Sequence, residues 1–374
     1  MISWKLILVG CVLLAATCVV SLTTSEAAEV VIRIDNPPES GIVTAMLFNS
    51  SSTFAGLREP FRFITLSFGD AIHGSISDLP GGEYALVVYF DENGNGRLDK
   101  NFIGIPTEPL GFSNRYWPKG PPTFRRAAFS LEAGETKAID VKLQPIFGKL
   151  GLLGIGAGVI SQTSPYRDAD TWNFQPVPAI SYIGDRLQFL GLKANYGILD
   201  LGDFALAVTA SYHFGAYNEK DSSYLGGMGD RDDTLMGGAA VHLQLSEGYK
   251  ISAGYEHDLL DRIGGGIGRF GLDKSFQKGL FTVTPKLALN WLSPELARYE
   301  YGVSADQSRS WRPAYDPGDA VELEVGLNLF RELSKDWRII FACSVIFLPS
   351  NITDSPIVDR SQIFNSFLAI NRMF

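Results

Sequence analysis

The chain has 374 residues, which is long enough for two domains. Hydrophobic residues make up 45% of it and charged residues 20%, a balance that argues against disorder. The formal net charge of −9, with no offsetting run of lysine or arginine, argues against nucleic acid as a partner, because neutralising phosphates requires a basic surface.

Residues 1–28 have the features of a signal peptide. Lys5 gives a short positive start, and residues 6–22 form an almost unbroken apolar run. A polar stretch with small residues follows, as signal peptidase requires, so we expect cleavage near Ala27 or Ala28. The sequence therefore predicts an exported protein.

Two alternatives to this cleavage remain open. Residues 8–11 resemble a lipoprotein box that ends at Cys11, and an apolar run of about 17 residues could just span a bilayer as an uncleaved helix. If the signal peptide is removed, Cys11 and Cys18 leave with it, and Cys343 is the cysteine that stays. One cysteine forms no internal disulfide, and Cys343 lies in an apolar run, so we interpret it as a small packing residue.

Residues 29–147 are predicted to form a β-sandwich domain. Short strand-like runs alternate with proline and glycine clusters, and about 115 residues is an ordinary size for a sandwich. The strands expected from alternation and apolar runs are residues 30–34, 41–48, 84–90 and 137–143. The composition changes near residues 145–148, which we take as the domain boundary.

Residues 149–374 are predicted to form a second all-β domain, a transmembrane β-barrel. Alternation recurs over lengths of about ten residues, the length of a tilted strand that crosses a bilayer. In residues 321–329, valine and leucine share one face while Glu322, Glu324 and Asn328 share the other. If the apolar faces meet lipid, these polar residues, with Lys250, Glu256, Lys286 and Asn290, face the lumen and pair there.

Two further features favour a membrane barrel over a soluble sandwich. Aromatic residues lie near the strand ends, where an interfacial girdle places them: Tyr182, Tyr212, Tyr249, Trp291 and Trp337. The chain also ends in an alternating strand, residues 364–374, whose last residue is Phe374. This resembles the C-terminal signal that the barrel assembly machinery of the outer membrane recognises.

The number of barrel strands follows less directly from the alternation of apolar and polar residues. About 226 residues suit ten or twelve strands, and twelve is the preferred number, although the alternation itself gives eleven. Residues 216–234 and 295–319 are long and polar, and we expect them to be loops. The eleven strands do not place both loops on the outer side, so one strand assignment must be wrong.

The barrel half resembles the MipA/OmpV family of outer-membrane proteins. The motifs, in chain order, are Ser164-Pro165-Tyr166, residues 176–182, Asp221-Ser222, residues 227–231, Thr284-Pro285, Tyr301-Gly302-Val303 and residues 312–315. The resemblance implies a barrel that is a scaffold for murein synthases and lytic transglycosylases. It implies no catalytic residues.

The front half is similar to an uncharacterised family of exported bacterial domains, through the run DENGNGRLD at residues 91–99 and through residues 104–108 and 111–114. That family brings an expectation of fold and no activity. We expect this domain to lie in the periplasm, because it precedes the first barrel strand and barrels begin and end on that side.

Residues 91–99 are the strongest candidate site, a calcium loop. The oxygen-bearing residues fall at alternate positions with a glycine at position 6, as in a loop that turns its oxygens around one hard cation. The proposed ligands are Asp91, Asn93, Asn95, the backbone carbonyl of Arg97, Asp99 and Glu108. Glu108 would replace the missing glutamate at position 12, which is Phe102. The alternative is a tight Asn-Gly turn capped by its own side chains.

A hydrolytic site at the barrel rim is a weaker hypothesis. The residues that could contribute are His213, Asp221, Ser222, Ser223, Asp230, Asp232 and Asp233. No nucleophile–base spacing stands out among them, so we interpret the group as a solvated acidic loop and expect no enzyme. The sequence therefore favours a non-enzymatic outer-membrane scaffold. A narrow channel for small polar solutes is the alternative, and an outer-membrane hydrolase comes third.

Overall fold

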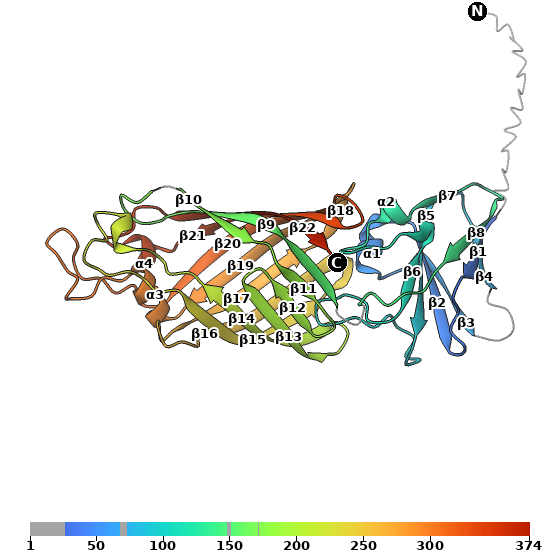
Figure 1. The fold of residues 1–374 in the computed structure, drawn as a ribbon, viewed down its shortest axis with the longest axis horizontal. Helices are drawn as coiled ribbons and strands as arrows, with labels where there is room; N and C mark the ends of the chain where they lie inside the picture. Colours follow the sequence, from blue (N-terminus) through green and yellow to red (C-terminus); the bar gives the residue numbers. More distant parts are fainter. Residues whose placement is uncertain (1–26, 68–72, 148–150, 171) are drawn as a thin grey trace, which may run out of the picture.

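A computed structural model describes residues 27–67, 73–147, 151–170 and 172–374 (Figure 1). The predicted signal peptide lies almost entirely outside the described residues. Within them, no helix is both long and apolar enough to cross a membrane. The described chain forms two bodies side by side, a small two-sheet domain followed by a long barrel, with the C-terminus beside the small domain.

The small domain is a β-sandwich, as predicted. The first sheet has the order β4 (His73–Leu79), β1 (Ala28–Ile34), β8 (Thr136–Val141), and the second the order β3 (Arg62–Ser67), β2 (Ile42–Phe48), β5 (Gly82–Asp91), β6 (Leu110–Phe112), with β7 (Phe129–Leu131) paired to β5. Alternate residues of both sheets, such as Ile32 and Val43, share one buried core. The first strand pairs in parallel with the last, which the alternation could not reveal.

A second apolar cluster covers the other face of the larger sheet. It joins Phe48 and Val87 to the helices α1 (Ser51–Gly56) and α2 (Phe124–Ala127). Both helices lie on the side of the sandwich that faces the barrel (Figure 1).

The second domain is a closed antiparallel barrel of twelve strands, which confirms the preferred number. The strands in chain order are β9 (Leu152–Thr163), β10 (Trp172–Pro178) continued by β11 (Ser181–Ile183), β12 (Leu187–Leu190), β13 (Lys193–Asp200), β14 (Phe204–His213), β15 (Thr234–Gln244), β16 (Tyr249–Asp258), β17 (Gly266–Lys274), β19 (Phe281–Leu292), β20 (Ala320–Glu332), β21 (Trp337–Phe347) and β22 (Gln362–Met373). β10 and β11 pair with β9 in the same register, so together they count as one strand of the barrel. β22 pairs with β9 and closes the barrel, and the short β18 (Phe276–Lys278) pairs only with β19.

The count of eleven strands from the sequence was therefore wrong by one. β12 has four residues, the fewest of the twelve strands, so a ten-residue pattern fits it poorly. With twelve strands, the loops 214–233 and 293–319 fall on the same rim, the one remote from the sandwich.

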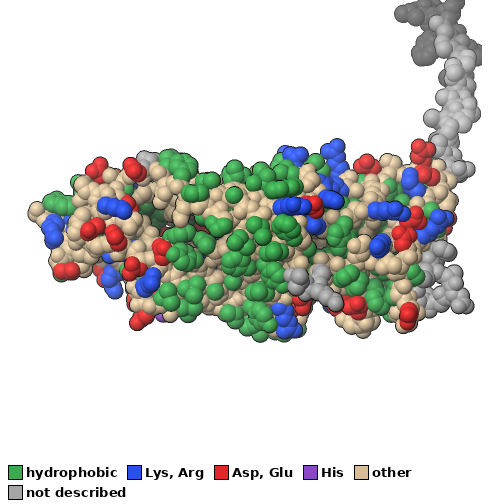
Figure 2. All heavy atoms as spheres, viewed as in Figure 1, with side chains coloured by type: hydrophobic (Ala, Val, Ile, Leu, Met, Phe, Trp, Pro, Cys, Tyr) green, Lys and Arg blue, Asp and Glu red, His purple; other side chains and the backbone are tan. Residues whose placement is uncertain are grey.

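The strand faces follow the predicted alternation. Val321, Leu323 and Val325 are exposed on the outside, whereas Glu322 between them is buried in the interior. Apolar side chains cover the barrel wall, and charged side chains gather toward the two ends (Figure 2). Such an apolar band between polar ends is what a lipid bilayer requires of a barrel.

Three of the predicted lumen residues, Glu256, Lys286 and Glu324, form ion pairs in the barrel interior. Glu256 forms ion pairs with Arg269 at 2.5 Å and with Lys193 at 3.6 Å. Lys286 and Glu324, on adjacent strands, form another at 3.1 Å. These ion pairs line the barrel interior with charges of both signs.

One edge of β10 has no strand partner within the described chain. Ala179 donates to the carbonyl of Gly156 in β9 at 3.0 Å, whereas the carbonyl of Ile180 accepts from Gly191 at 3.0 Å on the opposite side. Since donors alternate along a strand, the nitrogens of Pro176 and Pro178 point to the unpaired edge. Proline has no N–H group, so neither residue leaves a donor unsatisfied there.

Candidate functional site

The loop at residues 91–99 is a turn closed by its own side chains. The Asp91 carboxylate accepts from the backbone N–H groups of Gly94, Asn95 and Gly96 at 2.7, 3.1 and 2.7 Å. Gly94 and Gly96 have φ angles of +72° and +74°, which glycine adopts at little cost. This is the hydrogen-bond pattern of a self-capped turn.

The remaining predicted ligands join the same turn. The side-chain amides of Asn93 and Asn95 donate to the two oxygens of Asp99 at 2.6 and 3.0 Å. Glu108 is buried against the loop, and its two oxygens accept from the backbone N–H groups of Glu92 and Asp99 at 3.1 and 3.0 Å. The structure thus brings Asp91, Asn93, Asn95, Asp99 and Glu108 together, as the spacing suggested.

The oxygens of this loop accept hydrogen bonds from amide groups. Within the described parts of the chain, no three His, Cys, Asp or Glu side chains are grouped so that they could hold a metal ion. Calcium binding stays a prediction, and it requires Asp91 and Glu108 to exchange these hydrogen bonds for metal bonds. Titration calorimetry on the full chain tests this prediction. Heat of binding that saturates below about 1 mM Ca²⁺ and disappears in Asp91→Asn would support calcium binding, and no heat would show that the loop is a self-capped turn without a cation.

Glu108 gives the sandwich a dependence on pH. Burial raises the pKa of Glu108 from 4.5 to about 7, and the two hydrogen bonds from backbone N–H groups only partly offset this effect. The fold therefore favours the protonated carboxyl, and this contribution to stability is complete below pH 4.5 and lost as the pH rises through about 7. We expect Glu108→Gln to be less stable than the wild type at about pH 5, because its amide nitrogen cannot accept from a backbone N–H, and to lack the fall in stability that the wild type shows between about pH 5 and pH 8.

Pulse proteolysis of the sandwich in urea measures this difference on the full-length protein. The same pH profile in the wild type and in Glu108→Gln would contradict the assignment to Glu108.

Phe102 lies in the mouth of the barrel. It packs against Ala205 and Ala207 of β14, which are buried while their neighbours Phe204 and Val208 are exposed, and which therefore face the lumen. The calcium hypothesis treated Phe102 as a missing ligand, whereas the structure gives it a packing role. The loop at residues 100–105 therefore enters the barrel and covers part of its mouth.

Buried polar contacts fix the sandwich to the barrel rim. Glu332, at the end of β20, is 7% exposed. It forms an ion pair with Arg126 at 2.9 Å and accepts from the hydroxyl of Tyr116 at 3.3 Å and the backbone N–H of Lys119 at 3.1 Å. Arg338 of β21 donates to the backbone carbonyl of Lys119 at 2.6 Å. The sandwich is thus docked through several of its segments.

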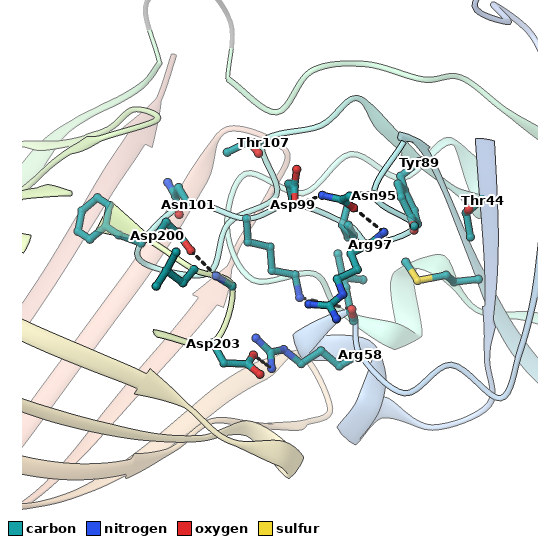
Figure 3. Close-up of a pocket in the computed structure, with 18 of the residues that line it drawn as sticks. Thr44, Arg58, Tyr89, Asn95, Arg97, Asp99, Asn101, Thr107, Asp200 and Asp203 are labelled. Atoms are coloured by element: carbon teal, nitrogen blue, oxygen red, sulfur yellow. Dashed lines mark hydrogen bonds and ion pairs between the residues drawn. The ribbon is translucent and has the colours of Figure 1, made fainter. Parts of the chain in front are cut away.

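A cavity of about 1160 Å³ remains between the sandwich and the barrel rim (Figure 3). Residues 57–60 and 95–102 line it from the sandwich, and residues 185–186 and 197–203 line it from the barrel. Arg58 and Asp203 reach across it and form an ion pair at 2.6 Å. Nothing in the sequence pattern indicated this cavity, because the residues that line it come from loops of two domains.

The opposite rim is covered by a folded cap. Its loops are residues 164–170, 214–233, 259–265, 293–319 and 348–361, with α3 (Pro294–Tyr301) and α4 (Ser350–Thr353) among them (Figure 1). The loops share one buried apolar core, which includes Tyr166, Leu225, Met228, Leu296, Tyr301, Val303 and Ile352. Tyr166, Met228, Tyr301 and Val303 belong to the family motifs of the sequence, so motifs far apart in the chain meet in this cap.

Arg312, another motif residue, is fully buried inside the cap. Its guanidinium donates to the backbone carbonyls of Tyr224, Gly226 and Gln307, and it lies 5.0 Å from the ring centroid of Trp311. A buried arginine that donates to carbonyls of separate loops holds those loops in one arrangement.

The residues of the hydrolase hypothesis do not assemble into a catalytic arrangement. His213 pairs with Glu300 at 2.8 Å, and the hydroxyls of Ser222 and Ser223 donate to the backbone carbonyl of Arg167 and to Asp168. Among the described residues, neither serine is hydrogen-bonded to a histidine. The carboxylates of Asp221, Asp230 and Asp233 accept from nearby backbone N–H groups, as expected for an ordered loop, and Asp232 is exposed.

Two family models match the chain. Residues 155–374 match the model described as MltA-interacting protein MipA, and residues 32–139 match one described as an uncharacterized protein conserved in bacteria (DUF2141). The chain is 31% identical over 214 residues to the MltA-interacting protein of Escherichia coli (strain K12), which covers 56% of this chain and 86% of that one. It is 24% identical over 240 residues to the outer membrane protein Omp26La of Vibrio anguillarum, covering 62% and 91%.

Solved structures of outer-membrane barrels also align with the chain, with low scores. The toluene transporter TbuX of Ralstonia pickettii aligns with a TM-score of 0.31 at 10% identity, covering 61% of this chain and 90% of that one. The outer membrane channel DcaP of Acinetobacter baumannii aligns with a TM-score of 0.25 at 9% identity, covering 94% and 99%. TM-scores this low carry no argument about function. The relatives named here are described as interacting or outer membrane proteins and not as enzymes.

Proposed function

The chain belongs to the MipA family, and from that membership we propose that this outer-membrane β-barrel protein is a scaffold that holds murein synthases and lytic transglycosylases at the membrane. The observation that carries the proposal is the covering of both barrel rims by folded structure. The sandwich and the Phe102 loop cover one rim, and the cap covers the other. A barrel covered in this way presents surfaces to partners and does not resemble an open pore.

The lengths of the connections at the two ends of the barrel support a periplasmic position for the sandwich. The turns on its side of the barrel are short, at residues 201–203, 245–248 and 333–336. The loops on the other side include residues 214–233 and 293–319. Outer-membrane barrels have short periplasmic turns and longer extracellular loops. The sandwich would then lie where murein enzymes work.

Two experiments test the proposal. After reversible cross-linking of whole envelopes, the tagged full-length protein should co-purify with murein synthases or lytic transglycosylases, and an unrelated barrel of similar abundance should not. Protease added to intact cells should leave the sandwich uncut. Absence of every murein enzyme from the purified complex would overturn the scaffold, and cleavage of the sandwich on intact cells would overturn its placement.

A narrow channel is the second candidate, because charged side chains such as Lys286 and Glu324 line the lumen, and a polar lumen suits small polar solutes. Planar-bilayer recordings separate the two functions. A scaffold covered at both rims should give no steady conductance, whereas a steady conductance that scales with salt would favour the channel.

A further inference from the structure

Charged side chains of both signs line both walls of the cavity between the sandwich and the barrel. Arg58, Arg97 and Lys100 line it from the sandwich, and Asp185, Asp200 and Asp203 line it from the barrel. On the sandwich wall, the carboxylate of Asp99 is already held by two asparagine amides. Glu59 and Arg186 add the opposite sign to the sandwich wall and the barrel wall.

Several of these charges have no partner within the described chain. Arg58 is paired with Asp203, but the side chains of Arg97 and Arg186 form no ion pair or hydrogen bond with the described residues, and those of Glu59 and Asp185 form none either. Figure 3 shows Arg97 and Arg58 extending from the sandwich toward the same part of the cavity. Unpaired charges of both signs around one cavity are available to a ligand that carries both signs.

Lys100 adds a further basic group beside Arg58. Its ammonium donates to the backbone carbonyls of Gly56 and Leu57 at 2.6 and 3.4 Å. Burial and the neighbouring Arg58 lower the pKa of Lys100 to about 7. An anionic group bound here would relieve that repulsion and favour the charged ammonium.

Apolar side chains on both walls suit the methyl groups of a small peptide. Phe63 of the sandwich is 65% exposed and Leu201 of the barrel is 67% exposed, and both line the cavity. Exposed large apolar groups beside unpaired charges are typical of a recognition surface.

We propose that this cavity binds a short peptide that carries free carboxylates and a free ammonium group, the chemistry of a murein stem peptide. The volume exceeds that of a single ion and suits several amino-acid residues. The carboxylates of the peptide would meet Arg97 and Arg186, and its ammonium would meet Asp185. This inference rests on the proposed function for the periplasmic position of the cavity.

The test is titration calorimetry on the full-length protein in detergent, with the synthetic tetrapeptide L-Ala-D-Glu-meso-diaminopimelate-D-Ala. We expect binding with a Kd below about 1 mM, weakened about tenfold in Arg97→Ala and in Asp185→Ala. Arg33→Ala is the matched control, because Arg33 is exposed on β1 outside the cavity, and it should bind like the wild type. A capped tetra-alanine amide without charges should not bind.

Three results would overturn the inference. These are no heat up to about 5 mM peptide while the barrel keeps its heat-modifiable migration, equal binding of the uncharged peptide, or equal binding by both cavity variants. Failure of the scaffold itself gives a different result, because murein enzymes would then be missing from the cross-linked complex while the peptide still bound. Peptide binding that depends on Arg97 and Asp185 supports the inference in either case.

Discussion

Glu332→Ala is expected to release the sandwich from the barrel rim. The substitution removes the carboxylate that pairs with Arg126 and accepts from Tyr116 and Lys119, and it leaves a partly buried guanidinium without its partner. Breaking one side of a buried ion pair costs about 3–5 kcal/mol. Hydrogen exchange of residues 116–127 should therefore become faster by on the order of 100-fold, while exchange of the barrel strands stays slow.

Glu247→Ala is the matched control for this prediction. Glu247 lies in a turn on the same rim, and its ion pair with Lys274 at 3.7 Å is largely exposed, so its loss should cost below about 1 kcal/mol. Unchanged exchange of residues 116–127 in Glu332→Ala would show that this ion pair does not hold the two domains together.

Arg312→Ala is expected to unfold the cap without unfolding the barrel. Its loss takes the donor from the backbone carbonyls of Tyr224, Gly226 and Gln307 and leaves a void where the fully buried side chain lies. Hydrogen bonds from a charged group contribute about 1.5–3 kcal/mol each, and losses at one site do not add fully, so we expect about 3 kcal/mol in total. Protease added to intact cells should then cut within residues 214–233 or 293–319, which the wild type should resist.

Arg298→Ala serves as the comparison within the same loops. Arg298 pairs with Asp316 at 2.8 Å, but both side chains are more than half exposed, so the cost should be below about 1 kcal/mol. If Arg312→Ala resists protease as well as Arg298→Ala does, the buried arginine does not hold the cap.

Four of the eight sandwich strands, β1, β2, β5 and β8, and most barrel strands could be predicted, because a strand with one buried face has a period of two. In residues 321–325 the pattern gave the outward and inward faces correctly. A strand as short as β12 is hard to recognise, because four residues are too few to establish a period. The parallel pairing of β1 with β8 depends on contacts between distant residues, which one sequence does not reveal.

The candidate site was predicted only in part. The spacing of Asp91, Asp99 and Glu108 correctly indicated that these side chains converge, because alternate oxygens in a glycine turn point to one side. The position of Phe102 inside the barrel had no local signal, since an aromatic residue in a loop suits a core as well as an interface. The cap was likewise hidden, because its core is assembled from residues in five loops with no shared periodicity.

The proline-bearing edge of β10 has a consequence for assembly of the barrel. Pro176 and Pro178 offer carbonyls but no N–H groups toward that edge. A strand from another chain, or a wrongly chosen strand of this one, could not form a complete ladder there, and the missing bonds would be costly in a medium without water. β10 can therefore be fully paired from one side only, through β9. The two prolines therefore discourage fusion of neighbouring copies into a larger sheet at this edge, while the seam that closes the cylinder lies between β9 and β22.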